Sequence, residues 1–230
     1  MGNIAVIPAR SGSKGLKDKN IKELAGKPLL AYSVNAAKES GLFDTIHVST
    51  DSERYAEIAR SSGADVPFLR SAEMSSDKAD SWDAVLEVLR KYEELGKSFD
   101  TVTLLQPTSP LRTGEHIRQA FKLYESKKAN AVFSVCEADH PPAWFHPLGP
   151  DGDMSGFGGG DGKQRQDFEK YYRINGAIYL INTGYFIKNH RNLFAEGVFA
   201  YIMDRKYSVD IDDEFDFKVA QAVYRELYGK

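Results

Sequence analysis

Two aspartates near the end of the chain, Asp210 and Asp212, have the spacing of a cation site. In an extended segment, residues two apart face the same side, so both carboxylates would point one way. Such carboxylates repel each other unless a cation lies between them, and Mg²⁺ binds one or two carboxylates together with phosphate oxygens and water. The alternative is an acidic run that favours the positive N-terminus of a following helix, a role that suits Asp213 and Glu214. For Asp210 both interpretations stay open.

A basic, glycine-rich turn follows the first apolar run of the chain. Between residues 10 and 20, small residues alternate with cations, which are Arg10, Lys14, Lys17 and Lys19. Small residues let the backbone approach a ligand closely and aim its N–H groups at one point, and the cations would offset the charge of a polyphosphate. The turn matches neither the P-loop nor the dinucleotide-binding glycine pattern. Since a basic turn alone is more often a solvated loop, the hypothesis needs support from the rest of the chain.

Three further side chains could hold a polar, acidic ligand. Arg165 and Arg173 carry guanidinium groups that bind carboxylates and phosphates in a bidentate manner, although pairing with Asp167 and Glu169 is the alternative. Gln106 follows an apolar run and offers both a donor and an acceptor to a polyol. Since each charged hydrogen bond contributes about 1.5–3 kcal/mol, several must converge. The combination suits nucleotidyl transfer, which depends on positioning and charge neutralisation.

Hydrophobic periodicity predicts the elements that must position these residues. Short apolar runs rich in β-branched residues predict strands at 4–7, 45–51, 65–69, 101–105, 131–135, 178–181 and 199–203. Helical spacing predicts helices from Pro28 to Gly41, around 55–59, at 82–92 after Asp80 or Ser81, after Thr113, and at the end with Phe215, Val219, Val223 and Leu227 on one stripe.

This alternation of strands and helices predicts an α/β fold with a mostly parallel sheet covered on both faces. Ligands bind such sheets beyond the carboxyl ends of the strands. The turn at 10–20, Asp51 and Gln106 each follow a predicted strand, so we expect them at that edge.

Composition limits the classes of partner. The chain has 230 residues, 42% of them hydrophobic and 27% charged, which is enough for one α/β domain with its own core. A net charge of −3 argues against a general nucleic-acid or anionic-membrane surface. The single Cys136 excludes an internal disulfide, fits a reducing compartment, and lies in an apolar run that predicts a buried thiol. No signal peptide or membrane span is visible, so we expect a cytoplasmic protein.

The composition of the sequence changes near His140. Residues 140–147 are rich in proline and aromatic side chains, and 155–162 are rich in glycine. Neither stretch suits a sheet or helix, so they indicate an arm whose aromatic side chains fit a partner subunit, with a disordered connector as the alternative. His140 and His146 lack a third metal ligand at regular spacing, which favours packing within the loop.

The chain resembles the CMP-sialic acid synthetases, or acylneuraminate cytidylyltransferases, over essentially its whole length. The resemblance lies in R-S-G-S-K-G-L-x-x-K-N (10–20), V-S-T-D (48–51), L-L-Q-P-T-S-P-L-R (104–112), R-x-N-G-A-I-Y (173–179) and D-I-D (210–212). It implies a three-layer, Rossmann-like nucleotide-diphospho-sugar transferase fold. One domain would span 1–230, with an inserted dimerisation arm at 138–172, and the protein would be a homodimer.

The resemblance also implies roles for single residues. CTP would be bound by Arg10, Ser11, Lys14, Lys19, Asn20 and Ser81. The sugar would be bound by Gln106, Arg165, Arg173 and Tyr179. Arg10, Lys19 and Asp210 would be catalytic, and Asp210 with Asp212 would hold Mg²⁺, for which Mn²⁺ could substitute. The implied reaction is attack of the C2 hydroxyl of an acidic 2-keto sugar on the α-phosphate of CTP.

The sugar itself stays open at this point. N-acetylneuraminate is the first expectation, but some members carry a Lys after a His-Pro pair in the arm, whereas Ala143, Trp144 and Phe145 stand here and no Lys or Arg occurs from 138 to 162. Legionaminate, pseudaminate or a Kdo-like acid are the alternatives. A D-x-D glycosyltransferase is more distant, since its pair usually lies mid-chain. An inactive nucleotide-binding regulator would be expected to lack the aspartates or the basic turn, and both are present.

Overall fold

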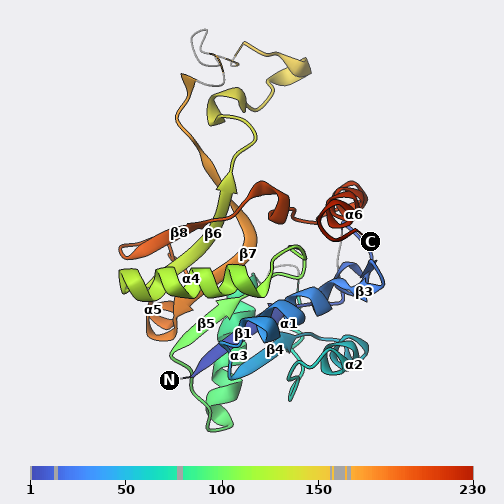
Figure 1. The fold of residues 1–230 in the computed structure, drawn as a ribbon, viewed down its shortest axis with the longest axis vertical. Helices are drawn as coiled ribbons and strands as arrows, with labels where there is room; N and C mark the ends of the chain where they lie inside the picture. The colour runs from blue at the N-terminus through green and yellow to red at the C-terminus, as the bar shows by residue number, and fades with distance from the viewer. Residues whose placement is uncertain are drawn as a thin grey trace.

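A six-stranded sheet of order β4-β1-β5-β7-β6-β8 forms the centre of the molecule (Figure 1). The computed structural model describes residues 2–12, 15–76, 80–155, 157, 164 and 167–229. The strands are β1 (Asn3–Pro8), β4 (Thr45–Ser49), β5 (Thr101–Leu104), β6 (Ala131–Glu137), β7 (Tyr172–Asn182) and β8 (Val198–Ile202). The pairs β1–β4, β1–β5 and β6–β8 are parallel, and only the two pairings of β7 in this sheet are antiparallel. The predicted mostly parallel α/β fold is confirmed.

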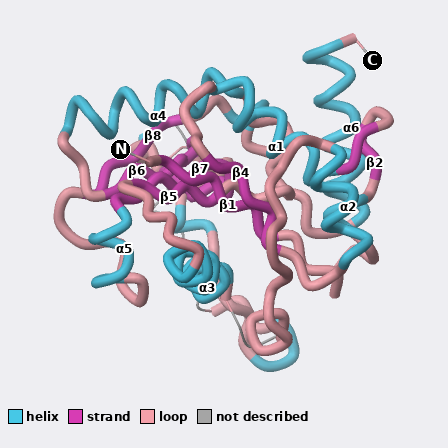
Figure 2. Tube along the Cα trace, turned by 90° about the horizontal axis from the view of Figure 1, so that it is seen from below, coloured by secondary structure: helices cyan, strands magenta, loops and turns pink. Residues whose placement is uncertain are grey.

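Helices cover both faces of this sheet and give three layers. One core packs α1 (Leu29–Ser40), α2 (Glu53–Ser61) and α4 (Gly114–Lys127) against one face. A second core packs α3 (Ser81–Glu94) and α5 (Thr183–Asn189) against the other. Figure 2 shows α1 and α4 on one side of the strands and α3 and α5 on the opposite side. No helix in the described part of the chain is long and apolar enough to cross a membrane.

Capping residues fix where the predicted helices begin and end. Asp80 accepts a hydrogen bond from the Asp83 amide at the start of α3, and Thr113 forms a capping box with His116 at the start of α4. Gly41 ends α1 with a φ of 70°, a conformation that favours glycine. Pro28 precedes α1 as its N-cap instead of being its first residue. Local sequence signals therefore located these boundaries to within a residue or two.

Two of the predicted elements differ in the structure. Residues 65–69 are not a strand, because the segment makes one isolated bridge, from Asp65 to His47, and Pro67 has no N–H to continue a ladder. In α6 (Glu214–Tyr228) the predicted stripe is wrong at its start, since Phe215 is 73% exposed while Phe217 and Ala220 are buried. The side of α6 that is buried is therefore rotated from the predicted one.

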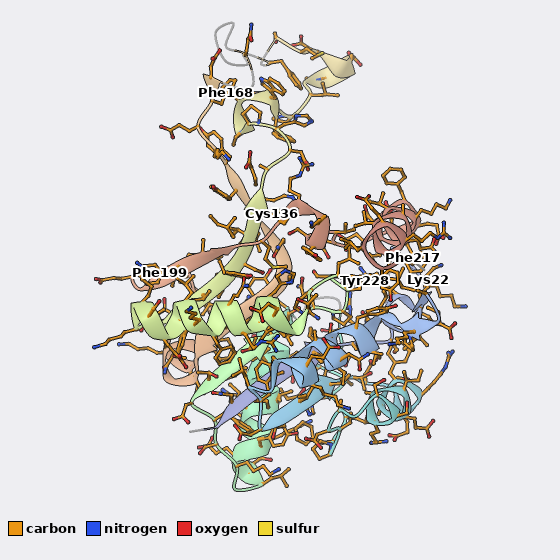
Figure 3. All side chains as sticks on the ribbon, in the orientation of Figure 1. Lys22, Cys136, Phe168, Phe199, Phe217 and Tyr228 are labelled. Atoms are coloured by element: carbon orange, nitrogen blue, oxygen red, sulfur yellow. The ribbon has the colours of Figure 1, made fainter. Side chains whose placement is uncertain are left out.

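The position of α6 explains this rotation. It packs with Leu24 of the hairpin β2 (Glu23–Leu24) and β3 (Lys27–Pro28), and with Ile211, in a third small core. Lys22 lies 4.8 Å from the centre of the Phe217 ring, and Figure 3 shows the two side chains together beside α6. Contacts with a distant hairpin, which periodicity cannot detect, set the buried face.

Strands β6 and β7 run beyond the sheet, and the described residues of the arm between them (138–155, 157, 164 and 167–171) project from the body of the molecule (Figure 1). Cys136 is fully buried near its base, as predicted, whereas Phe168 lies out in the arm (Figure 3). The His140 ring lies 5.5 Å from Trp144, and the His146 ring lies 5.7 Å from Phe157. Both histidines therefore pack within the arm, in line with the sequence interpretation.

Candidate functional site

The site lies where the carboxyl ends of β1 and β5 meet. β1 pairs in parallel with β4 on one side and β5 on the other, so the chain changes direction across the sheet at this point. The turns that follow these two strands border a cleft of about 690 Å³. The predicted site residues that line it are Arg10, Lys19, Asn20, Ser81, Gln106, Asp210 and Asp212.

The basic turn and the late aspartates face each other in this cleft. Lys19 Nζ lies 3.0 Å from Asp212 Oδ1 and donates to the Ile211 carbonyl at 2.8 Å. A Cβ atom at Gly15 would lie 2.6 Å from the Asp212 carbonyl oxygen. A larger residue would therefore not fit at this position unless the backbone shifted. Lys14 lies outside the described residues. The structure thus brings together two groups that are almost 200 residues apart.

Asp210 is the more buried of the two aspartates. Burial raises the pKa of its carboxyl group, and the charge of Asp212 acts in the same direction. A hydrogen bond from Thr108 and the charges of Lys19 and Arg173 oppose this shift. Asp210 Oδ1 is buried and has no hydrogen-bond partner among the described residues. An ionised, buried oxygen without a partner is costly unless a cation is present.

These donors fit a hard divalent cation. Two carboxylates face one cleft, and one of their oxygens is buried without a partner in the described part of the chain. No cluster of three or more His, Cys, Asp or Glu side chains occurs among the described residues, so the protein alone would not complete an octahedral shell. Mg²⁺ usually completes its shell with water and substrate phosphates. The site therefore suits a cation that arrives with a polyphosphate.

The raised pKa of Asp210 leads to a stability prediction. The folded-state pKa of Asp210 exceeds the unfolded value near 3.8, so the ionised side chain destabilises the folded protein. This destabilisation is complete at pH values above the folded-state pKa and absent at pH values below 3.8. Asp210→Asn should raise Tm at pH 7, and the gain should vanish below pH 3.8. Thermal unfolding at several pH values measures this. The exposed Asp212→Asn is the control without a comparable gain, and a lower Tm for Asp210→Asn at pH 7 would contradict the prediction.

Two residues that were predicted to bind the nucleotide, Ser11 and Asn20, form hydrogen bonds that stabilise the basic turn at 10–20. The Ser11 amide and hydroxyl donate to the carboxylate of Asp51 at 2.8 and 3.0 Å, and Ser11 is not among the residues that line the cleft. Asn20 is buried, and its side-chain amide donates to the Arg10 carbonyl at 3.0 Å. These bonds hold the shape of the turn, so that Arg10 and Lys19 remain its cleft-lining cations among the described residues.

One further cation of the cleft, Arg70, was not predicted from the sequence. Arg70 lines it and is buried, and its guanidinium donates to Ser49 Oγ at 3.0 Å and to the Ser49 carbonyl at 2.8 Å. Burial lowers the pKa of Arg70 to about 10, which still leaves it charged at neutral pH. The residue follows a stretch without any phosphate-binding pattern, so no sequence signal could have identified it.

A second cavity of about 660 Å³ adjoins the cleft and contains two predicted sugar-binding residues. Gln106 lines both spaces, and Tyr179 lines the second cavity, where its ring packs edge-on against Trp82 at 5.3 Å. Burial and the charge of Asp210 raise the pKa of Tyr179 to about 12, so its hydroxyl is neutral and can donate. Gly176 has a φ of 72°, and a side chain there would collide with Gln106 Oε1. This glycine leaves room for Gln106.

The two predicted arginines are placed differently. Arg173 Nη2 lies 3.4 Å from the Ser208 carbonyl, and Arg173 lines neither the cleft nor the second cavity. Its charge nevertheless lowers the pKa of Asp210. Arg165 lies outside the described residues, so the structure does not place it.

Comparisons with known proteins agree with this geometry. The cytidylyltransferase family model matches residues 4–202. The chain is 40% identical to an N-acylneuraminate cytidylyltransferase of Escherichia coli O18:K1:H7 over 97% of its length and 52% of that protein. It is 36% identical to a CMP-N,N'-diacetyllegionaminic acid synthase of Legionella pneumophila, over 95% of this chain and 94% of that one. The chain spans about half the length of the first of these relatives.

A solved structure shares the fold. It is a CMP:2-keto-3-deoxy-manno-octonic acid synthetase complexed with CTP, with a TM-score of 0.74 over 99% of this chain and 100% of that one. The sequence identity is 13%, so the likeness concerns the fold alone. The predicted three-layer, Rossmann-like fold is confirmed by this match.

Proposed function

The chain belongs to the cytidylyltransferase family, and we propose that it transfers CMP from CTP to an acidic nine-carbon 2-keto sugar and releases pyrophosphate, with N-acetylneuraminate as the first candidate. The observation that carries the proposal is the meeting of the basic turn and the aspartate pair in one cleft, beside Gln106 and a second cavity. One part of this arrangement suits a triphosphate with its cation, and the other suits a polar sugar.

The nucleotide side offers several positive groups. Arg10, Lys19 and Arg70 line the cleft, and Ser81 begins the 14-residue helix α3, whose N-terminus faces the same space. Helix N-termini bind anions through free N–H groups and the helix dipole. These charges would offset those of the triphosphate and of the pyrophosphate that leaves. We assign Arg10 and Lys19 to this role.

The aspartate pair would hold Mg²⁺ against the same triphosphate. When bound there, the cation would supply charge stabilisation at the phosphate oxygens. In the reaction, the sugar's C2 hydroxyl oxygen forms a bond to the α-phosphorus, while the bond from that phosphorus to the bridging oxygen of pyrophosphate breaks. The hydroxyl proton passes to a base, and the Asp210 carboxylate is the candidate for it in this cleft. The protein's own residues hold the two reactants in line for this displacement.

The sugar would occupy the second cavity. Gln106 offers an amide to hydroxyl groups, and the neutral Tyr179 hydroxyl adds a donor. The relatives named above act, by their names, on N-acylneuraminate and on a diacetyllegionaminic acid, which supports this class of substrate. N-acetylneuraminate is proposed first, and legionaminate, pseudaminate and a Kdo-like acid are its alternatives.

The proposal predicts pyrophosphate release from CTP only when Mg²⁺ and one acid of this class are both present. A panel of N-acetylneuraminate, legionaminate, pseudaminate and Kdo, assayed for pyrophosphate with and without Mg²⁺, measures this. ATP in place of CTP is the control and should give little product. Release with none of the acids, or with ATP as readily as with CTP, would contradict the proposed function.

We also propose that the arm pairs two copies of the chain. Its exposed apolar side chains include Phe145 and Leu148, at 66% and 62% exposure, which is unusual for a monomer surface. The protein should sediment as a dimer at micromolar concentration, and a Phe145→Asp, Leu148→Asp variant should sediment as a monomer. Leu95→Asp, at an exposed position outside the arm, is the matched control. A monomeric wild type would refute the pairing.

A further inference from the structure

A buried polar cluster lies beneath the cleft and has no part in the function proposed so far. We propose that Asn175 at its centre is a positioning residue that fixes two walls of the cleft together. One wall is the turn 106–109, which carries Gln106, and the other is the segment 208–212, which carries the aspartate pair. The kinetic part of this proposal rests on the proposed function, and the structural part does not.

Asn175 holds the aspartate wall through a serine. Its side chain is fully buried, and its Nδ2 donates to Ser208 Oγ at 2.9 Å. The Ser208 hydroxyl is also buried and donates to the Asp204 carbonyl at 2.9 Å. Ser208 stands two residues before Asp210, so these bonds fix the backbone that leads into the aspartate pair.

The same residue holds the Gln106 wall through its backbone. Ser109 is fully buried, and its hydroxyl donates to the Asn175 carbonyl at 3.1 Å. The next residue, Gly176, leaves the space that the Gln106 side chain fills. Both ends of the 106–109 turn therefore depend on the backbone at 175–176.

The two walls are also bonded to each other. The Ile211 amide, between the two aspartates, donates to the Thr108 carbonyl at 2.9 Å. The buried guanidinium of Arg112 donates to the carbonyls of Gln106, at 3.2 Å, and Ala177, at 2.9 Å. The walls and the β7 backbone thus form one hydrogen-bonded unit, in which a change at Asn175 reaches both.

The orientation of the Asn175 amide is fixed by its oxygen. Oδ1 accepts from the Ser134 hydroxyl at 2.6 Å and from the Ala177 amide at 3.2 Å. The register between β6 and β7 shifts next to Ser134, between Phe133 and Val135, and this irregularity brings the serine to Asn175. Both polar atoms of the Asn175 side chain thus have partners, and a buried amide held in this way keeps a single geometry. The network joins three segments of the chain, at Ser134, Asn175 and Ser208, that are each more than 30 residues apart in the sequence.

Single-wall variants separate positioning from general stability. Ser208→Ala should lower kcat about tenfold and leave the KM for the sugar within about twofold, because it frees the aspartate wall. Ser109→Ala should raise that KM about fivefold with little change in kcat, because it frees the Gln106 wall. Asn175→Ala should lower kcat as Ser208→Ala does, because both remove the same bond, and should raise the KM less than Ser109→Ala does, because alanine keeps the carbonyl that Ser109 binds. Val132→Ala, a buried change in the β6 core, is the control that lowers Tm while leaving kcat and KM of the folded enzyme unchanged.

Hydrogen exchange of the protein without substrate gives the deciding measurement. Asn175→Ala should speed exchange of the Ile211 amide at least about tenfold, and of peptides covering 106–110 and 208–213, whereas Val132→Ala should not. Unchanged exchange in both segments would overturn the proposal whatever the kinetics. If the proposed function is wrong, the wild type releases no pyrophosphate. The exchange measurement needs no substrate, so it still tests the positioning role of Asn175. Equal loss of kcat in Asn175→Ala and Val132→Ala at matched Tm would also contradict it.

Discussion

Asp212→Ala is expected to lower the rate of pyrophosphate release at least about a hundredfold, a loss of ~3 kcal/mol in transition-state stabilisation. Asp212 faces the cleft with Asp210 and is 80% exposed at its side chain, so a cation and its phosphates can reach it. Removal would leave Asp210 as the sole carboxylate of the pair. The rate with saturating CTP and sugar, titrated with Mg²⁺, measures the loss.

Stability should change little in the same variant. In the Lys19–Asp212 ion pair the carboxylate of Asp212 is exposed to solvent. Such pairs typically contribute about 0–1 kcal/mol to the free energy of unfolding. Glu214→Ala is the matched control, because it removes a carboxylate of the same segment that pairs with Lys22 and does not line the cleft. A near-wild-type rate for Asp212→Ala at saturating Mg²⁺ would remove Asp212 from the cation site.

Lys19→Met should reduce kcat/KM for CTP by about 10²–10³, because it deletes a preorganised charge from the phosphate side of the cleft. The Lys19 side chain is 15% exposed, and two bonds to the Ile211 carbonyl and to Asp212 hold its ammonium in place. A charge fixed in this way needs little reorganisation when the triphosphate arrives. Initial rates over a range of CTP concentrations measure the effect.

Lys22→Met provides a closely matched comparison. Lys22 also pairs with a carboxylate of the late segment, Glu214, at 3.0 Å, but its ammonium lies against Phe217 on the outer side and does not line the cleft. Its replacement should change kcat/KM less than about threefold, as expected for a surface pair. Similar losses in both variants would show that Lys19 acts through the stability of the segment and not through the nucleotide.

Much of the fold could be predicted because its signals are local. The apolar run of β1, the caps Asp80 and Thr113, and Gly41 at the end of α1 each act within a few residues. The direction of β7 could not be predicted, because an apolar run identifies a strand but not its partner. The strand predicted at 65–69 was wrong, because a strand needs continuous pairing with a neighbouring strand. This segment pairs with its neighbour only through the single bridge from Asp65 to His47.

The site could be predicted in part for a similar reason. Residues of the basic turn and the aspartate pair have a recognisable spacing, and both line the cleft. Arg70 has no such spacing, and Asn175 stands in the motif at 173–179 without a role that the sequence indicates. The roles of both arise from contacts with Ser49, Ser134 and Ser208 that only the folded chain creates. Arg173 has a guanidinium that suits a ligand, but the fold turns it toward the Ser208 carbonyl.

We propose above all that the basic turn and the aspartate pair bind one nucleotide and its cation across a single cleft. The most direct test of this proposal is a crystal structure with Mn²⁺ and a CTP analogue that cannot release pyrophosphate, using the anomalous signal to locate the metal. We predict a Mn²⁺ peak about 2.0–2.3 Å from oxygens of both Asp210 and Asp212, with the triphosphate beside Lys19. A metal peak away from the aspartates, or a triphosphate bound in the cavity beside Trp82, would contradict the account.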